Sequence, residues 1–240
     1  MAEQVLTEAP RPFAGAAAIA VAIGFNVPFA ILGATFDYPD VLRRPAGDVL
    51  DLFAQGGAPL ILTWHAFALS ALALVPLAFA LTLTRKRVAD APGLAIGAAI
   101  AGALSALAQA IGLWRWVFVV PGLARVHSDA AAGDEAKRAA ERTFDLINQY
   151  GGIAIGEHLG QLLLAIFVVC LGALQLRERK FVTGGLALLT ATAIVVGTGE
   201  GLMLALGQSG EGFALVTIGG FVGLTLWLIA TGIGTMRGAR

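Results

Sequence analysis

The chain has 240 residues, of which 58% are hydrophobic and only 13% are charged, and its formal net charge is zero. A soluble globular domain has about 25% charged residues, so this composition excludes an ordinary soluble protein and indicates an integral membrane protein. The zero net charge argues against nucleic acid as a partner. The single cysteine, Cys170, excludes an internal disulfide and a cysteine-based zinc site.

The start of the chain does not resemble a cleaved secretory signal. Residues 1–12 contain Glu3 and Glu8 beside Arg11, and the apolar run after them exceeds the 7–15 residues or so of a signal core. We therefore expect a retained first helix. Six apolar segments reach the length of about 20 residues that crosses a bilayer. They are residues 13–36, 59–84, 93–116, 152–176, 181–206 and 213–235. The predicted fold is an all-α, polytopic membrane protein with one domain over residues 1–240.

The connections between these segments alternate in charge. Residues 85–92 and 177–180 are short and basic, whereas residues 37–58 and 117–151 are long and acidic. Lys and Arg concentrate in cytoplasmic links, so the bias places the short links and both termini in the cytoplasm. The six helices then form three hairpins in series, each of which enters and leaves from the cytoplasmic side.

The outer connections contain two amphipathic stretches, residues 46–55 and 134–149, with apolar and charged residues at helical spacing. We expect short helices there, either on the outer membrane surface or solvated in the loops. Aromatic rings favour the membrane interface, and five of them fall near the expected outer boundary. They are Tyr38, Trp64, Trp114, Trp116 and Tyr150.

Two parts of the chain resemble each other, residues 51–72 and residues 145–166. Each runs from an amphipathic stretch through Gly-Gly into a helix with an early histidine, and a basic link follows. Arg85, Arg87 and Gly93 match Arg177, Arg179 and Gly185 at one constant offset. The pattern indicates either a duplicated hairpin or chance similarity between low-complexity membrane sequences.

Polar side chains inside a membrane are costly and are candidates for function. At a rise of about 1.5 Å per residue, six of them lie at a similar depth below the outer surface. They are His65, Gln109, Glu157, His158, Gln161 and Glu200. Because Glu157, His158 and Gln161 are three or four residues apart, they share one helix face. The pattern predicts a ligand-binding pocket open to the outer side, or else hydrogen bonds between helices.

Other residues of the same segments have simpler expected roles. Arg115, between two tryptophans, is expected to be an interfacial anchor with an ion pair to Glu157 or Glu200, and His127 a solvated loop residue. Small and polar residues in the third segment recur at steps of four and three, which favours close helix packing. They are Ala98, Gly102, Ser105, Gln109, Gly112 and Trp116.

The polar layer allows three functions. Two membrane histidines are too few for a three-histidine zinc centre, and no metal site is expected. The first choice is an accessory or ligand-binding protein that meets a membrane partner or a second copy of itself. The alternatives are a redox protein with b-type haem between His65 and His158, and a proton-coupled transporter that uses Glu157 and Glu200 as a relay.

Three stretches of the chain resemble a bacterial family of uncharacterised membrane proteins, domain of unknown function 4386. They are "RPFAGAAAIAVAIGF" near the start, "RERKFVTGGLALLTATAIVVG" at the second basic link and "GGFVGLTLWLIATGIGTMRG" near the end. The resemblance implies a six-helix bundle, and we expect this bundle to lie in a bacterial cytoplasmic (inner) membrane. It implies no reaction, and no site residues are transferred from it.

Overall fold

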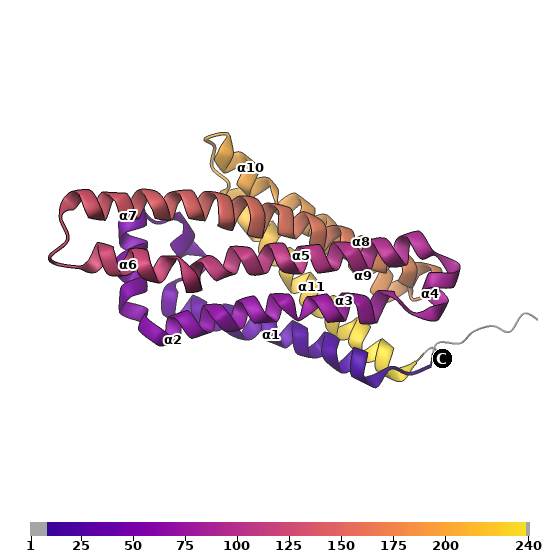
Figure 1. Cartoon of the computed structure of the whole chain (residues 1–240). Helices are drawn as coiled ribbons and strands as arrows, with labels where there is room; N and C mark the ends of the chain where they lie inside the picture. The colour runs from indigo at the N-terminus through magenta and orange to yellow at the C-terminus, as the bar shows by residue number, and fades with distance from the viewer. Residues whose placement is uncertain (1–8, 239–240) are drawn as a thin grey trace, which may run out of the picture. The chain divides into compact units, whose positions relative to one another are not determined.

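The structure is a computed structural model that describes residues 9–238, apart from the side chains of Leu204, Glu211 and Ala214. Within this range every regular element is helical, which confirms the predicted all-α class (Figure 1). The elements are α1 (Pro12–Phe36), the 3₁₀-helix η1 (Asp40–Arg43), α2 (Ala46–Leu72), α3 (Leu74–Thr82), α4 (Arg85–Asp90), α5 (Pro92–Phe118), α6 (Val120–Ser128), α7 (Asp134–Ile147), the π-helix η2 (Asn148–Leu159), α8 (Gly160–Arg177), α9 (Phe181–Gly197), α10 (Gly199–Ala205) and α11 (Glu211–Arg237).

Six helices in the described range are long and apolar enough to cross a membrane, as predicted. They cover Pro12–Phe36, Ala46–Thr82, Pro92–Ser128, Asp134–Arg177, Phe181–Met203 and Leu215–Arg237. The second, third and fourth have 37, 37 and 44 residues, well beyond the 20 or so that a bilayer needs. Much of the two acidic connections therefore continues the helices instead of forming loops. The grouping into three hairpins stays a prediction.

Both amphipathic stretches of the outer connections are helical, although their place on the membrane surface stays a prediction. Residues 46–55 form the start of α2, which bends at Gly57 (φ 57°, ψ −151°) two residues before Pro59. A left-handed φ suits glycine, because it has no Cβ to clash with the backbone. The bend separates the amphipathic start of α2 from its apolar remainder.

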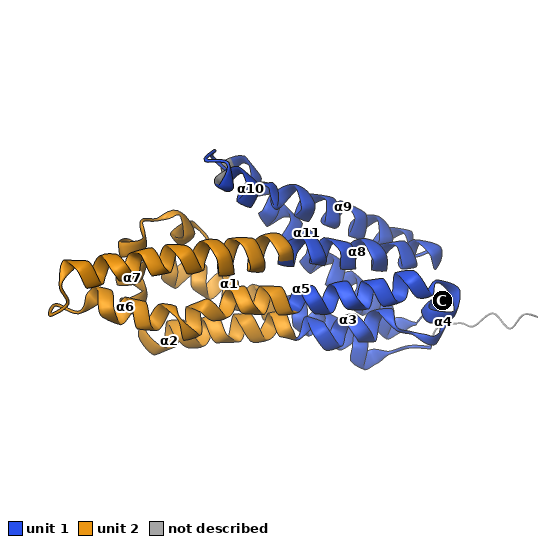
Figure 2. Cartoon of the chain, turned by 45° about the horizontal axis from the view of Figure 1, so that its top comes forward, with its two compact units in different colours: residues 1–23, 73–106, 160–240 blue, residues 24–72, 107–159 orange. Residues whose placement is uncertain are grey.

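The chain divides into two compact units, shown in different colours in Figure 2. Unit 1 consists of residues 1–23, 73–106 and 160–240, and unit 2 of residues 24–72 and 107–159. In unit 1, α9 packs against both α8 and α11. In unit 2, α6 packs against α2 and α7.

The core of unit 2 is rich in aromatic rings. Trp64 and Trp116 stack with their ring centroids 4.9 Å apart, and Phe36 meets Trp116 edge to face at 5.4 Å. Both tryptophans are fully buried, so these two rings pack inside the protein and do not contact lipid headgroups, while their depth in the membrane stays a prediction. The apolar side of the α2 amphipathic stretch reaches the same core through Phe53. Aromatic pairs add about 0.5–1.5 kcal/mol each beyond the area they bury.

The predicted small-residue face of α5 is buried along its whole length, as expected. In unit 1, a Cβ on Gly102 would lie 2.6 Å from the Ala78 Cβ, and the Ser105 hydroxyl donates to the Gly160 carbonyl at 2.7 Å. In unit 2, a Cβ on Gly112 would lie 2.6 Å from the Gly156 Cα. Small residues at these positions let neighbouring backbones approach closely.

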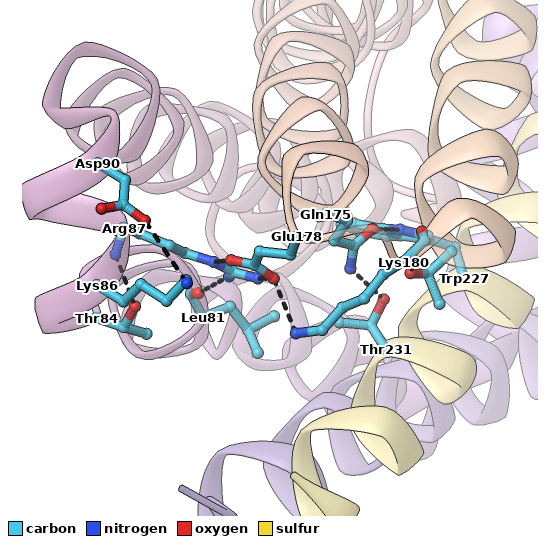
Figure 3. A network of polar contacts seen from close by, with 11 residues as sticks. Leu81, Thr84, Lys86, Arg87, Asp90, Gln175, Glu178, Lys180, Trp227 and Thr231 are labelled. Carbon is cyan, nitrogen blue, oxygen red and sulfur yellow. Dashed lines mark hydrogen bonds and ion pairs between the residues drawn. The ribbon is translucent and has the colours of Figure 1, made fainter. Parts of the chain in front are cut away.

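Unit 1 also contains a buried polar network at the end of α8. The Trp227 indole donates to the Gln175 side-chain oxygen at 3.1 Å, and the Gln175 amide nitrogen donates to the Thr231 hydroxyl at 3.0 Å (Figure 3). All three residues are buried. The network ties α8 to α11 and satisfies polar groups that would be costly to leave unpaired in an apolar interior.

Candidate functional site

The six polar residues of the predicted layer fall in different units. His65, Gln109, Glu157 and His158 belong to unit 2, whereas Gln161 and Glu200 belong to unit 1. Gln109 and Gln161 are buried and the other four are partly exposed. Among residues 9–238, no group of three or more His, Cys, Asp or Glu side chains is placed to hold a metal ion.

Glu200 lies within the fifth membrane segment, Phe181–Met203, but in a separate short helix at its end. The helical segment expected over residues 181–206 breaks near Thr198, so that Glu200 falls in the short helix α10. A Cβ on Gly210 would lie 2.7 Å from the Glu200 Cγ. The glycine therefore leaves room for the Glu200 side chain beside the turn that follows α10.

Arg115 is the most unusual residue of unit 2, because its side chain is charged and its exposed fraction is only 7%. Its Nη1 donates to the Gly112 carbonyl at 2.5 Å and its Nη2 to the Asn148 side-chain oxygen at 3.0 Å. Its guanidinium carbon lies 5.1 Å from the centre of the Trp116 ring. Arg115 is therefore buried inside the unit and does not present its guanidinium to the membrane surface as an anchor would, while its depth in the membrane stays a prediction.

One donor of Arg115 is left over in this environment. The Nε–H is buried and has no hydrogen-bond partner among the described residues. A buried donor that stays unsatisfied costs about 1–3 kcal/mol, and more when the group is charged. Glu157 is the acid whose charge acts most strongly on the Arg115 guanidinium. The site thus combines a buried cation, a nearby carboxylate and an unused donor.

The backbone that covers Arg115 is a π-helix, η2, which includes Gly151, Gly152 and Gly156. A Cβ on Gly152 would lie 2.5 Å from the guanidinium carbon of Arg115. The guanidinium therefore rests against bare backbone. π-Helical turns are rare and occur frequently at functional sites, and this one contains both Glu157 and His158. The Gly-Gly pair was the signal in the sequence, but it does not distinguish a π-helix from a turn.

His65 is held by a tryptophan of α5. The Trp114 Nε1 donates to the His65 Nδ1 at 3.3 Å, and the two rings are nearly parallel. A histidine that accepts at Nδ1 has its proton on Nε2 when neutral. An axial haem ligand has the opposite arrangement, with Nε2 on the iron and Nδ1–H donated to a neighbour. This hydrogen bond does not fit haem ligation through Nε2 of His65.

A second polar cluster lies at the charged end of unit 2, beyond the apolar part of the third membrane helix. The His127 Nδ1 lies 2.8 Å from the Asp51 Oδ1, and its Nε2 lies 2.9 Å from the Glu141 Oε1. Carboxylates only accept, so the imidazole satisfies both when it is doubly protonated. His127 is thus not the solvated loop residue that the sequence suggested, because it joins α6 to α2 and α7.

The charge of His127 should make unit 2 sensitive to pH. Asp51 and Glu141 both hydrogen-bond the imidazole, so the folded unit favours its doubly protonated, charged form. The stabilisation is then complete below the unfolded histidine pKa of about 6.5 and is lost at higher pH, where the imidazolium gives up its second proton. We expect His127→Gln to cost about 1 kcal/mol at low pH, since Asp51 is half exposed and screened by solvent.

Thermal unfolding of the detergent-solubilised protein across this pH range measures the effect. The gap between the wild type and His127→Gln should narrow as the pH rises. Asp48→Asn, an exposed substitution on the same helix as Asp51, should leave the wild-type slope unchanged. Parallel pH profiles for the wild type and His127→Gln would contradict the expected role of the imidazolium.

Comparison with known proteins identifies the family but no closer relative. No curated protein and no solved structure matches the chain. One family matches residues 13–232, which include four of the membrane helices completely, most of the first and the last, and both clusters described above. The extent of this match shows that the chain belongs to the family described as "Domain of unknown function (DUF4386)".

Proposed function

We propose that this membrane protein binds a small acidic solute through Arg115, on the side of the membrane opposite the basic links. The observation that supports the proposal most is the buried Nε–H of Arg115 that has no partner among the described residues. A carboxylate or phosphate oxygen matches a guanidinium donor in charge and in geometry. Binding would thus remove the penalty of an unsatisfied, buried and charged group.

The surroundings of Arg115 suit a ligand site. Gly152 places no side chain over the guanidinium, so a ligand has only backbone of a π-helix to displace there. His65, Gln109, Glu157 and His158 belong to the same unit and supply further polar groups. Gln161 and Glu200 stay predictions as pocket residues. We also propose that the protein lies in a bacterial inner membrane with its basic links on the cytoplasmic side. Binding to a protein partner or to a second copy of the chain stays a prediction.

The two alternative functions receive less support. The tautomer set by Trp114 does not favour haem on His65. A proton relay through Glu157 and Glu200 would have to join the two units, and no observation on either unit alone favours it. A ligand-binding role needs only residues of unit 2.

Thermal unfolding in detergent tests the ligand-binding role. The probes are sodium acetate, phosphate and sulfate, each compared with sodium chloride at equal ionic strength. We expect at least one acid to raise the midpoint of the wild type beyond the chloride value. A ligand at 100 times its dissociation constant stabilises by about 2.7 kcal/mol. Arg115→Lys keeps the charge but lacks the Nε–H fork, and should lose this shift.

The matched control is Arg125→Lys, because Arg125 is an exposed arginine of α6 in the same unit. It should keep the shift of the wild type. The proposal is wrong if none of the acids exceeds chloride, or if Arg115→Lys responds as strongly as the wild type.

A further inference from the structure

Four segments that are distant in the sequence meet at one end of unit 1. The Arg11 backbone N–H donates to the Thr235 carbonyl at 3.0 Å, and the Arg11 guanidinium donates to the Ala80 carbonyl at 2.6 Å. Arg87, just beyond Ala80, pairs with Glu178. These contacts bring together the starts or ends of α1, α3, α8 and α11, and with them most of the basic residues of the unit. The basic residues are Arg11, Arg85, Lys86, Arg87, Arg177, Arg179, Lys180 and Arg237.

The acidic side chains of the two basic links form ion pairs with basic residues of the protein itself. Glu178 accepts from Arg87 through two hydrogen bonds of 2.5 and 2.8 Å, and from Lys180 at 2.8 Å (Figure 3). Asp90, the other acid of the two basic links, lies 3.8 Å from Lys86. The positive charge of the surface therefore comes from arginines outside this network. Four of these are exposed: Arg85, Arg177, Arg179 and Arg237.

Arg179 occupies a backbone position where glycine is the usual residue. Its φ is 61°, and the Arg179 and Lys180 N–H groups donate to the Leu176 and Gln175 carbonyls at 2.9 and 2.8 Å. This is the helix-ending turn in which a left-handed residue follows the helix, and glycine is the usual choice there. Arginine gives the backbone no advantage over glycine at such a position. Any benefit of Arg179 therefore comes from its exposed, charged side chain.

The same end also exposes apolar side chains. Phe181 and Val182, which follow the second basic link, are 67% and 83% exposed. The basic links begin where the apolar helices α3 and α8 end, at Thr82 and Arg177. Cations beside exposed apolar residues at the ends of membrane helices lie at the level of lipid headgroups. A phospholipid can bind both kinds of residue, because its phosphate pairs with the cations and its acyl chains contact the apolar side chains.

We propose that Arg85, Arg177 and Arg179 bind the phosphate of an anionic phospholipid, such as phosphatidylglycerol, at this end of unit 1. Basic groups near a membrane surface attract anionic lipids, and guanidinium groups bind phosphate through paired hydrogen bonds. The internal pairing of Glu178 with Arg87 and Lys180 removes the acid that would otherwise compete for these arginines.

Native mass spectrometry of the detergent-solubilised full chain tests the lipid site. The probes are palmitoyl-oleoyl phosphatidylglycerol and the corresponding phosphatidylcholine. We expect the wild type to prefer phosphatidylglycerol, and Arg85→Gln/Arg177→Gln/Arg179→Gln to bind it at least about tenfold more weakly. The control Arg125→Gln/Arg138→Gln/Arg142→Gln removes three exposed arginines of unit 2 and should bind as the wild type does. Equal binding by both triple variants would overturn the proposal.

Two further measurements separate lipid binding from other roles. Arg179→Gly should weaken phosphatidylglycerol binding and yet raise the thermal midpoint in lipid-free detergent, because glycine suits the left-handed turn. A purely structural role for Arg179 predicts no loss of lipid binding in this variant. Inorganic phosphate, added against chloride at equal ionic strength, should not displace the lipid. Displacement would identify a site for free phosphate instead and overturn the proposal.

Discussion

Replacement of Glu178 with alanine is expected to destabilise unit 1 by about 3–5 kcal/mol, because it leaves the buried Arg87 without its counter-ion. The side chains of Arg87 and Glu178 are only 5% and 10% exposed. The Arg87 guanidinium would keep its contact with the Leu81 carbonyl, but a neutral acceptor does not compensate a buried charge. Reversible unfolding in mixed detergent micelles measures the loss.

Two variants check this explanation for Glu178. Asp90→Ala removes an exposed acid that lies 3.8 Å from Lys86, and should cost no more than about 1 kcal/mol. The double variant Arg87→Met/Glu178→Leu removes both charges together and should recover most of the stability, since a buried pair replaced by apolar residues is often neutral. A double variant as unstable as Glu178→Ala would contradict the uncompensated charge as the cause.

The pair should also respond to acid. Burial alone would raise the pKa of Glu178, but hydrogen bonds and charges from Arg87 and Lys180 outweigh it and hold the pKa below its ordinary value. A lowered folded pKa means that the stabilisation is present above the unfolded carboxyl pKa and is lost as the pH falls through the folded value. Glu178→Ala should therefore flatten the acid limb of the wild-type stability profile.

Gly112→Ala is expected to have the second large effect, a loss of roughly 3 kcal/mol or more in unit 2. The added Cβ would lie 2.6 Å from the Gly156 Cα and 3.1 Å from the Gly151 carbonyl oxygen. Both neighbours are backbone atoms of the π-helix, so no side chain can rotate away. The helices would have to separate, and the hydrogen bond from Arg115 of α5 to Asn148 of η2 would be lost with that contact.

Gly97→Ala is the matched control for Gly112, because Gly97 lies in the same helix with nothing within 4 Å of its Cβ position. It should be neutral or stabilise by up to about 1 kcal/mol, since alanine favours a helix over glycine. Thermal unfolding of both variants in one detergent compares them directly. A Gly112→Ala protein as stable as Gly97→Ala would show that α5 and η2 are not in close contact.

The sequence predicted the features that repeat along a helix. Hydropathy located all six helices, and the four-and-three spacing in α5 identified the face that the structure buries. The residues that it misplaced depend on contacts between distant segments. Position along the helix alone suggests an interfacial place for Arg115, Trp64 and Trp116. The helix face on which they lie, however, points toward the aromatic core of unit 2. His127 looked like a loop residue because its partners, Asp51 and Glu141, are 76 and 14 residues away.

The two basic links are a second case in which the sequence pattern does not predict contacts between distant segments. Arg87 and Arg179 occupy matched positions of the sequence pattern, but the structure gives them different environments. Arg87 is buried against Glu178, whereas Arg179 is exposed in a left-handed turn. The two links therefore have different roles, since Glu178 of the second link forms an ion pair with Arg87 of the first. Residue type and spacing alone do not reveal such an exchange.

The pairing of Arg87 with Glu178 has a consequence for how the chain is synthesised and inserted. The two residues are 91 positions apart, so the first basic link leaves the ribosome long before its acid exists. In the proposed orientation, with the basic links in the cytoplasm, Arg87 is a hydrated cation during that interval, and Arg85, Lys86 and Arg87 together are expected to oppose translocation of the link across the membrane. Once Glu178 is made, Arg87 leaves water and joins the folded unit. In that orientation, one arginine would serve first as a topology signal during insertion and later as the structural cross-link that the folded unit contains.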